Sequence, residues 1–366
     1  MELQDICSYV KTKVETSNYS IEDYISTENM LPEKGGITVA SSFPSGKVTE
    51  FQENDILISN IRPYFKKIWK ADRRGCCSND VLCIRANNNV DAEFLYYLLS
   101  QDLFFAYVMS GANGSKMPRG DKQQIMNWEI EIPSEKEDQR RIASILSSLD
   151  RKIELNNKIN ADLEEMAQAI FKNWFVDFEP FKDGNFVDSE LGMIPEGWKV
   201  GTLEDLITIK YGKDHKKLED GTFPVYGSGG LMRFVNSWLY DGESVLIPRK
   251  GTLDNIMYVC EKFWTVDTMF FSVPKMDYVM KYVYNYIKRF DFSKMNEGTS
   301  VPSNTAARLN KMPILIPTHK ILEMYDETLC PIYNKRKMKD KESRTLSLLR
   351  DTLLPRLMSG ELEVPE

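Results

Sequence analysis

The sequence has few of the side chains that hold metal ions or act as catalytic bases. Its 366 residues include only two histidines, His215 and His319, and its six cysteines form no C-x-x-C pair. Zinc sites draw on clustered cysteine and histidine ligands, so this composition predicts no metal site. The cysteines are interpreted as reduced thiols, which are typical of a cytoplasmic protein.

Motifs for phosphate binding and covalent catalysis are also missing. Gly46-Lys47 and Gly212-Lys213 lack the upstream glycine of a G-x-x-x-x-G-K-[ST] loop, and no G-x-S-x-G occurs. The Asn-Pro-Pro-aromatic tetrad of amino-methyltransferases is absent too. Most carboxylates lie on predicted helices or beside lysines, as solvated groups do. The sequence therefore predicts a chain that is not an enzyme.

Long apolar segments do not occur. No run reaches the roughly 18 apolar residues of a membrane span, and the N-terminus lacks a basic segment followed by an apolar one, so we expect neither a span nor a signal peptide. With 42% hydrophobic and 28% charged residues the composition is globular, and 366 residues favour two domains. The net charge of −7 argues mildly against a nucleic-acid partner unless basic side chains gather locally.

What is present is a predicted helix over residues 134–176, about 40 residues and about 60 Å long, without proline or glycine. Positions three and four residues apart form a coiled-coil seam, namely Ile142, Ile145, Leu149, Lys152, Asn156, Ile159, Leu163, Met166 and Ile170. The middle of this seam is polar. A polar seam residue fixes register at a cost in stability, and we assign this role to Asn156 and Asn157. The alternative is a helix buried in one globular core.

The chain repeats itself. GSKMPRGDKQQIMNWEIEIP (114–133) aligns without a gap with GTSVPSNTAARLNKMPILIP (298–317), and ENDILIS resembles GESVLIP. A second helix follows the second copy, and its polar middle around Arg336 would face that of the first helix if the two run antiparallel. Pro331 is expected to kink or break it. Matching apolar runs predict strands at 56–59, 81–84, 245–248 and 269–273, and short helices at 94–99 and 282–287.

These patterns predict an α+β protein with two repeated α/β domains and two long helices, whose polar middles would face each other if the helices run antiparallel. The predicted divisions are a first domain at 1–133, its helix at 134–178, a surface linker at 179–197, a second domain at 198–317 and its helix at 318–360.

Basic side chains cluster at corresponding places of the two copies. Lysine and arginine suit phosphate contacts, while arginine, asparagine and serine reach base edges in a major groove. An ordinary solvated surface is the alternative for any single cluster, and the match between copies favours function. The candidate DNA-binding residues are Arg62, Lys66, Lys67, Lys70, Arg73, Arg74, Ser115, Lys116, Arg119, Lys210, Lys213, Lys216, Lys217, Arg249, Lys250, Thr299, Ser300, Asn304 and Arg308.

Four segments in order along the chain resemble the specificity subunits of type I restriction–modification systems. They are EKEDQRRIASILSSLDRKIELNNKI (135–159), IFKNWFVDF (170–178), IPEGWKVGTLEDL (194–206) and LLPRLMSGEL (353–362). The resemblance implies a non-catalytic subunit whose two target recognition domains each read half of a bipartite site in double-stranded DNA. It also implies that two pseudo-symmetric α/β target recognition domains are separated by the two long helices, paired as an antiparallel coiled coil. The helices would span successive major grooves, about 34 Å apart.

The resemblance also implies partners. Two methyltransferase subunits would dock on the helices, and motor-nuclease restriction subunits would join them. S-adenosylmethionine, ATP and magnesium would belong to those partners, so we expect no cofactor on this chain. Two other functions stay open: a scaffold of a related complex that does not bind DNA, and a methyltransferase or nuclease with unfamiliar motifs.

Overall fold

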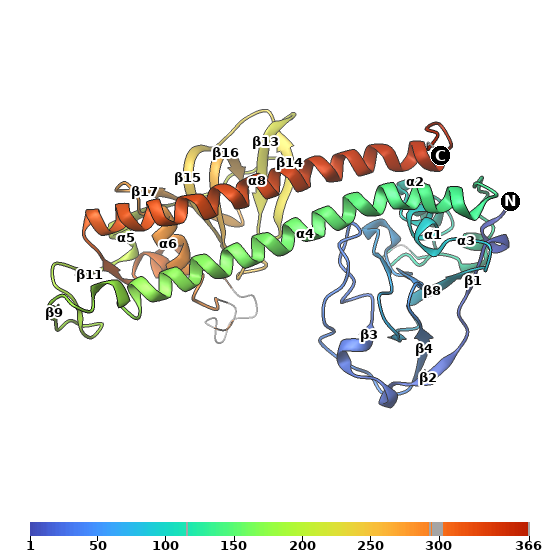
Figure 1. Cartoon of the computed structure of the whole chain (residues 1–366), viewed down its shortest axis with the longest axis horizontal. Coiled ribbons are helices and arrows are strands. Elements are labelled where there is room, and N and C mark those ends of the chain that lie inside the picture. Colours follow the sequence, from blue (N-terminus) through green and yellow to red (C-terminus); the bar gives the residue numbers. More distant parts are fainter. Residues whose placement is uncertain (115, 293, 295–302, 365–366) are drawn as a thin grey trace. The chain divides into compact units, whose positions relative to one another are not determined.

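The computed structural model describes residues 1–114, 116–292, 294 and 303–364, and it divides into two compact units. Unit 1 comprises Met1–Asn157 and Lys341–Glu366, and unit 2 comprises Lys158–Asp340. Each unit contains one globular domain and part of both long helices, α4 (Lys136–Phe175) and α8 (His319–Met358) (Figure 1). In the described ranges, no helix is both long and apolar enough to cross a membrane.

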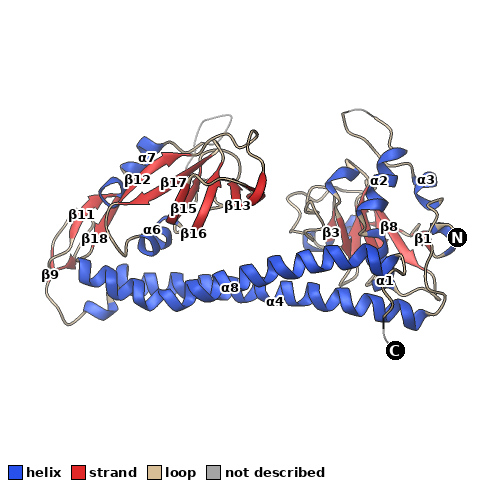
Figure 2. Ribbon diagram, turned by 90° about the horizontal axis from the view of Figure 1, so that it is seen from above, coloured by secondary structure: helices blue, strands red, loops and turns tan. Residues whose placement is uncertain are grey.

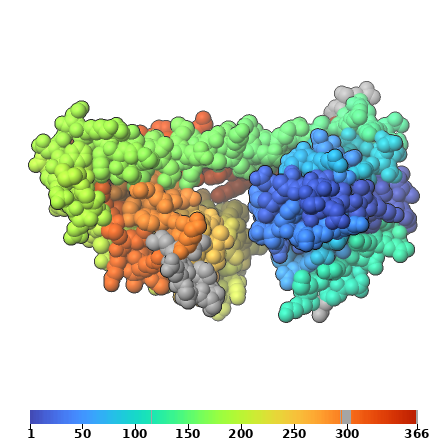
Figure 3. All heavy atoms as spheres, turned by 90° about the horizontal axis from the view of Figure 1, so that it is seen from below, coloured from blue at the N-terminus to red at the C-terminus, as the bar shows by residue number. Residues whose placement is uncertain are grey.

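The domain of unit 1 has two four-stranded sheets, ordered β1-β8-β5-β6 and β2-β4-β7-β3. Short helices share one apolar core with the first sheet and the α4 segment of this unit. Figure 3 draws the residues of this domain as spheres, coloured from blue to green along the sequence. The strands are β1 (Cys7–Tyr9), β2 (Lys13–Glu15), β3 (Tyr24–Ile25), β4 (Lys47–Phe51), β5 (Ile56–Ser59), β6 (Ile68–Lys70), β7 (Gly75–Cys77) and β8 (Val81–Ala86). The α-helices are α1 (Ala92–Leu99), α2 (Asp102–Ser110) and α3 (Lys122–Met126).

The domain of unit 2 has a six-stranded sheet, ordered β12-β17-β15-β16-β13-β14, and two strand pairs, β9–β10 and β11–β18. Its strands are β9 (Phe186–Val187), β10 (Ile194–Pro195), β11 (Lys199–Thr202), β12 (Ile207–Tyr211), β13 (Asp220–Gly227), β14 (Gly230–Val235), β15 (Tyr240–Pro248), β16 (Met257–Thr265), β17 (Met269–Pro274) and β18 (Pro313–Ile316). Its short helices are α5 (Leu203–Leu206), α6 (Met280–Ile287) and α7 (Ala306–Asn310).

The internal repeat is confirmed by matching topology and matching hydrogen bonds. The order β1-β8-β5-β6 in unit 1 is repeated as β12-β17-β15-β16 in unit 2. The Leu3 amide donates to the Trp128 carbonyl at 2.9 Å, and the Leu203 amide donates to the Met312 carbonyl at 2.9 Å. All the predicted strands and short helices lie inside observed elements of the same kind. The α+β class with two repeated domains is therefore confirmed.

In each unit the α4 and α8 segments run antiparallel, with a short helix, α1 or α6, between them and the sheet (Figure 2). In unit 1 the Arg350 guanidinium lies 2.6 Å from the Asp150 carboxylate, which also accepts a hydrogen bond from Tyr97 at 2.7 Å. In unit 2 the Glu164 carboxylate pairs with Arg336 and accepts from Tyr284 at 2.5 Å. The same set of groups therefore attaches each domain to its helices.

The apolar ends of both helices enter two different cores. The core of unit 1 contains Ile142 and Leu146 of α4 together with Leu354 and Leu357 of α8. The core of unit 2 takes the opposite ends: Leu163, Ala167, Phe171 and Phe175 of α4, and Leu322, Tyr325, Leu329 and Ile332 of α8. The middles of the helices join neither core, which explains their polar sequence.

The structure does not bear out the break expected at Pro331, nor the position of Met166 in the buried seam. Pro331 does not break α8, which is continuous from His319 to Met358. Proline removes the amide that would bond to the Glu327 carbonyl, but both residues lie on the exposed face, where water can serve that carbonyl. Met166 is 52% exposed and Ala167 is buried instead, because a helix packed against a domain follows a wider face than a strict coiled-coil seam.

The predicted surface linker is more ordered than expected. A single 3₁₀ turn, Glu179–Phe181, is followed by the β9–β10 strand pair. The ring of Phe181 lies 5.2 Å from that of Trp198, whose side chain is buried in the core of unit 2. Both ends of the linker are therefore anchored by aromatic packing.

The two asparagines assigned to helix register differ sharply. Asn156 is fully buried and donates to the Ser343 hydroxyl at 3.3 Å, whereas Asn157 is exposed and lies outside the buried seam. Among the residues that the structure describes, the side-chain oxygen of Asn156 has no hydrogen-bond partner.

We therefore predict that Asn156→Leu raises the free energy of unfolding by about 1 kcal/mol, because it replaces an incompletely bonded buried amide with an apolar side chain. Urea unfolding of the full chain measures this change. Asn157→Leu is the matched control and should stay within about 0.5 kcal/mol of the parent. A destabilised Asn156→Leu variant would contradict the prediction.

Candidate nucleic-acid interface

In the domain of unit 1, two loops are joined by main-chain contacts at one end of the central strands β5 and β8. The strand-end loop (residues 60–66) follows β5, and the glycine loop (residues 112–120) precedes α3. Ile61 and Arg119 form a β-bridge, and the Gly120 amide donates to the Asn60 carbonyl at 3.3 Å. The Asn60 amide in turn donates to the Asp80 carbonyl at 2.9 Å, in the supporting turn (residues 78–80) before β8.

The domain of unit 2 repeats this construction. Its strand-end loop (residues 249–252) follows β15, its glycine loop is described from residue 303, and its supporting turn (residues 266–268) precedes β17. Lys250 and Ser303 form the β-bridge, and the Asn304 amide donates to the Arg249 carbonyl at 3.0 Å. The Arg249 amide donates to the Thr268 carbonyl at 2.8 Å. The sequence alignment pairs these positions with those of unit 1, so both domains present the same two loops.

Conformation restricts the residues in the strand-end loops. Arg62 and Lys66 both have φ of 51°, in the left-handed region that side chains rarely adopt. Gly251 has φ of 88°, and a Cβ there would lie 2.4 Å from the Ser228 hydroxyl oxygen. Such conformations cost free energy and are concentrated at functional sites.

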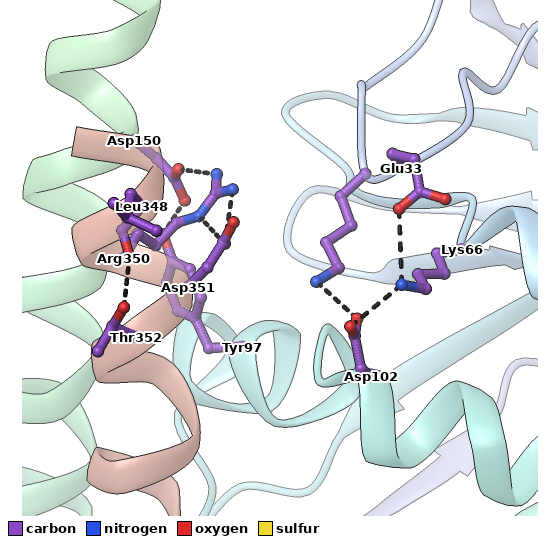
Figure 4. Close-up of polar contacts among 10 residues, drawn as sticks. Glu33, Lys66, Tyr97, Asp102, Asp150, Leu348, Arg350, Asp351 and Thr352 are labelled. Carbon is purple, nitrogen blue, oxygen red and sulfur yellow. Dashed lines mark hydrogen bonds and ion pairs between the residues drawn. The ribbon is translucent and has the colours of Figure 1, made fainter. Parts of the chain in front are cut away.

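Most of the predicted basic cluster at 60–75 is engaged within unit 1. Lys66 contacts both Asp102 (3.1 Å) and Glu33 (3.6 Å), and Asp102 also pairs with Lys34 (Figure 4). Burial lowers the pKa of Lys66, but these carboxylates raise it by more, so the ammonium stays charged and paired. Lys67 donates to the Thr27 carbonyl at 2.7 Å, and burial lowers its pKa.

The other members of that cluster are paired as well. Lys70 lies 2.9 Å from Glu93, Arg73 lies 2.8 Å from Asp72, and Arg74 pairs with Glu50. Arg62 makes no ion pair with any described residue, and its left-handed backbone holds it within the strand-end loop. Arg119 is paired with Asp80 at 3.2 Å but its side chain is 56% exposed. The loops, rather than the whole cluster, therefore carry the available charge of unit 1.

The basic residues of unit 2 are more available. Lys210, Lys213, Lys216 and Lys217 are exposed, and within the described part of the chain none of them makes an ion pair. The Arg249 guanidinium lies over the ring of Tyr211, 5.5 Å from its centroid, and Lys250 is exposed. This edge of the domain is therefore positively charged.

The remaining candidates divide into three groups. Lys116 is exposed in the glycine loop of unit 1, and Arg308 lies at α7. Asn304 is 1% exposed, and its side-chain amide donates to the Pro248 carbonyl at 2.9 Å. Asn304 therefore holds the loops together rather than facing bases. Ser115, Thr299 and Ser300 lie outside the described residues.

A family model for the type I restriction modification DNA specificity domain matches residues 1–165 and 195–339, which is most of the chain. The chain belongs to this family. It is 28% identical to the type I restriction enzyme MjaIX specificity subunit of Methanocaldococcus jannaschii, over 76% of this chain and 71% of that protein. It is 22% identical to the HindI specificity subunit of Haemophilus influenzae, over 98% of each chain.

The fold of this chain is similar to that of a solved structure. The S subunit of a type I restriction–modification system from M. genitalium aligns with a TM-score of 0.57 at 18% identity, covering 98% of this chain and 95% of that one. At this identity the likeness concerns the fold alone. Among the described residues, no group of three or more histidine, cysteine, aspartate or glutamate side chains is arranged to hold a metal ion.

Sequence reasoning missed the supporting turns and some apolar surface. Asp80 and Thr268 accept the key amides through main-chain carbonyls, which leave no mark in the sequence. Tyr211 and Met232 are each 55% exposed, although the candidate residues predicted from the sequence include neither of them.

Asn304→Ala is predicted to destabilise unit 2 by about 1–2 kcal/mol, because the buried Pro248 carbonyl would lose its donor. Thermal unfolding of the full chain measures this. Lys250→Ala, in the neighbouring loop, should change stability by less than about 0.5 kcal/mol and instead weaken DNA binding. Equal stability of the two variants would show that Asn304 has no structural role.

Proposed function

We propose that the chain is the DNA-specificity subunit of a type I restriction–modification complex, and that each domain reads one half of a bipartite site. The observation that carries this proposal is the same two-loop construction in both domains, presented by matching supporting turns. Two copies of one construction on different sequences suit two different half-sites in double-stranded DNA. Family membership gives independent support.

The long helices suit a role in spacing and assembly. Each helix contributes to both units, so α4 and α8 link the two reading domains through two stretches of chain. We propose that the helices fix the spacing between half-sites and dock two methyltransferase subunits, with motor-nuclease subunits bound to that core. S-adenosylmethionine, ATP and magnesium then act on the partners. The chain itself is a non-catalytic subunit, and its six unpaired cysteines suit the cytoplasm.

Base-resolution mapping of adenine methylation tests this function. DNA from cells with the matching methyltransferase, with and without the chain, would be compared. We expect a split motif with a fixed gap that is methylated only when the chain is present. A continuous motif would mean that one domain alone reads DNA, and methylation that does not depend on the chain would favour the scaffold.

The same assay tests the register function of Asn156. Asn156→Leu is expected to loosen the gap, so that sites one base pair longer or shorter also become methylated, because an apolar seam accepts more than one alignment. Asn157→Leu, on the exposed face, should leave the gap unchanged. A fixed gap in both variants would remove Asn156 from the spacing mechanism.

The salt dependence of DNA affinity distinguishes basic residues that are free to contact phosphates from those that form ion pairs within unit 1. Replacing Lys210, Lys213, Lys216 and Lys217 with alanine should reduce the slope of log affinity against log salt by about 0.9 for each phosphate that the variant no longer neutralises. The matched control replaces Lys66, Lys70, Arg73 and Arg74, which removes the same charge from groups engaged within unit 1. Its slope should not change. Equal slopes for the two variants would contradict the assignment.

A further inference from the structure

The domain of unit 2 exposes apolar side chains beside its positively charged loops. Tyr211, at the end of β12, and Met232, in β14, are each 55% exposed, and Leu231 is 40% exposed. Exposed apolar groups gathered among polar ones mark binding surfaces. The question is which ligand offers both negative charge and apolar groups.

The supporting turn at 266–268 brings these side chains to one place. Gly212, directly after Tyr211, packs so closely on this turn that a Cβ there would lie 2.0 Å from the Val266 carbonyl oxygen, and the Val266 amide donates to the Tyr226 carbonyl at 3.1 Å. A Cβ on Gly227 would lie 2.5 Å from the Met232 sulfur and 3.6 Å from a Val266 methyl group. Met232 therefore covers Gly227 beside the turn that Gly212 also contacts.

Cations lie beside Tyr211 and in the loops next to the supporting turn, which itself carries the exposed Asp267. Arg249 lies over the Tyr211 ring, and its amide is bonded to the same turn through Thr268. Lys213, Lys210 and Lys250 are exposed, and none makes an ion pair with another described residue. The nearby carboxylate of Asp214 accepts a hydrogen bond from the Lys216 amide at 3.0 Å, a contact within its own loop.

This combination of charges and apolar groups matches the major groove of DNA. The cations suit phosphates. The thymine C5-methyl group is the apolar contact that base pairs offer in that groove, whereas the other groups presented there donate or accept hydrogen bonds. An apolar surface for a protein partner would not need unpaired cations in the adjoining loops.

We propose that Met232 and Tyr211 contact thymine methyl groups in the half-site read by the domain of unit 2, with Arg249 and the adjacent lysines on the phosphates. This inference rests on the proposed DNA-reading function and names the group that is read. It makes Met232 a specificity-determining residue, and it means that the half-site contains a thymine read through its methyl group.

The test uses the full chain and deoxyuridine. The chain first selects its site from a pool of random duplexes. Each thymine of the selected half-sites is then replaced in turn by deoxyuridine, which removes only the methyl group. At least one replacement in one half-site should weaken binding about fourfold, the effect of one buried methyl group.

Met232→Ala and Met232→Gln identify the side chain responsible. Each variant should bind the thymine duplex about fourfold more weakly and lose the difference between thymine and deoxyuridine at that position. Leu348→Ala, an equally simple loss of a side chain that is 70% exposed on α8, should keep the difference. Using two variants guards against a local folding defect in either.

The outcomes are distinguishable. Indifference to deoxyuridine at every position overturns the inference while leaving the proposed function intact. An unchanged thymine preference in both Met232 variants removes Met232 from the reading of that methyl group and also overturns it. Failure to select any duplex sequence would instead contradict the DNA-reading function itself.

Discussion

The architecture depends on two helices that are each buried at both ends in different cores. α4 gives Ile142 and Leu146 to unit 1, and Phe171 and Phe175 to unit 2, while α8 crosses between the same cores in the opposite direction. Among the described residues, the middle segments of the helices belong to neither core, and directional polar contacts join them, from Asn156 to Ser343 within unit 1 and from Asn160 to Asp340 within unit 2. Apolar seams tolerate sliding, whereas hydrogen bonds and ion pairs are satisfied in few alignments. The polar middle therefore specifies the pairing that the apolar ends stabilise.

The domains are attached to the helices by buried polar contacts as well as apolar ones. In unit 1, Asp150 binds both Arg350 and Tyr97 (Figure 4). In unit 2 the 5% exposed side chain of Lys281 lies between Asp326 (2.7 Å) and Glu243 (3.1 Å). Burial lowers the pKa of Lys281, but the two carboxylates outweigh it and raise the pKa, so the lysine remains charged. Such groups hold one orientation because a displaced charge would stay buried without a partner.

Much of the fold could be predicted because it rests on periodic signals. Helix length, strand positions and the repeat all follow from apolar spacing, and the topology confirms them. The effect of Pro331 could not be predicted, since it depends on which face of α8 is exposed. The available basic residues of the candidate site could be predicted less well than the fold. A sequence shows that Lys66 and Lys70 are basic but not that Asp102 and Glu93 lie opposite them, because those acids are distant along the chain. Asn304 was predicted to bind DNA because the sequence does not show that the Pro248 carbonyl, also distant along the chain, accepts its side-chain amide.

The strand-end loops are held in place largely by main-chain hydrogen bonds. In unit 1 the contacts of Asn60, Ile61, Arg119 and Gly120 that fix the loops use amides and carbonyls, which nearly every amino acid supplies. Outward side chains there can be exchanged without loosening the frame that presents them. The conformation of the loops and the identity of their outward side chains can therefore change independently. Surface substitutions can change what the loops contact while the main-chain frame that presents them stays the same.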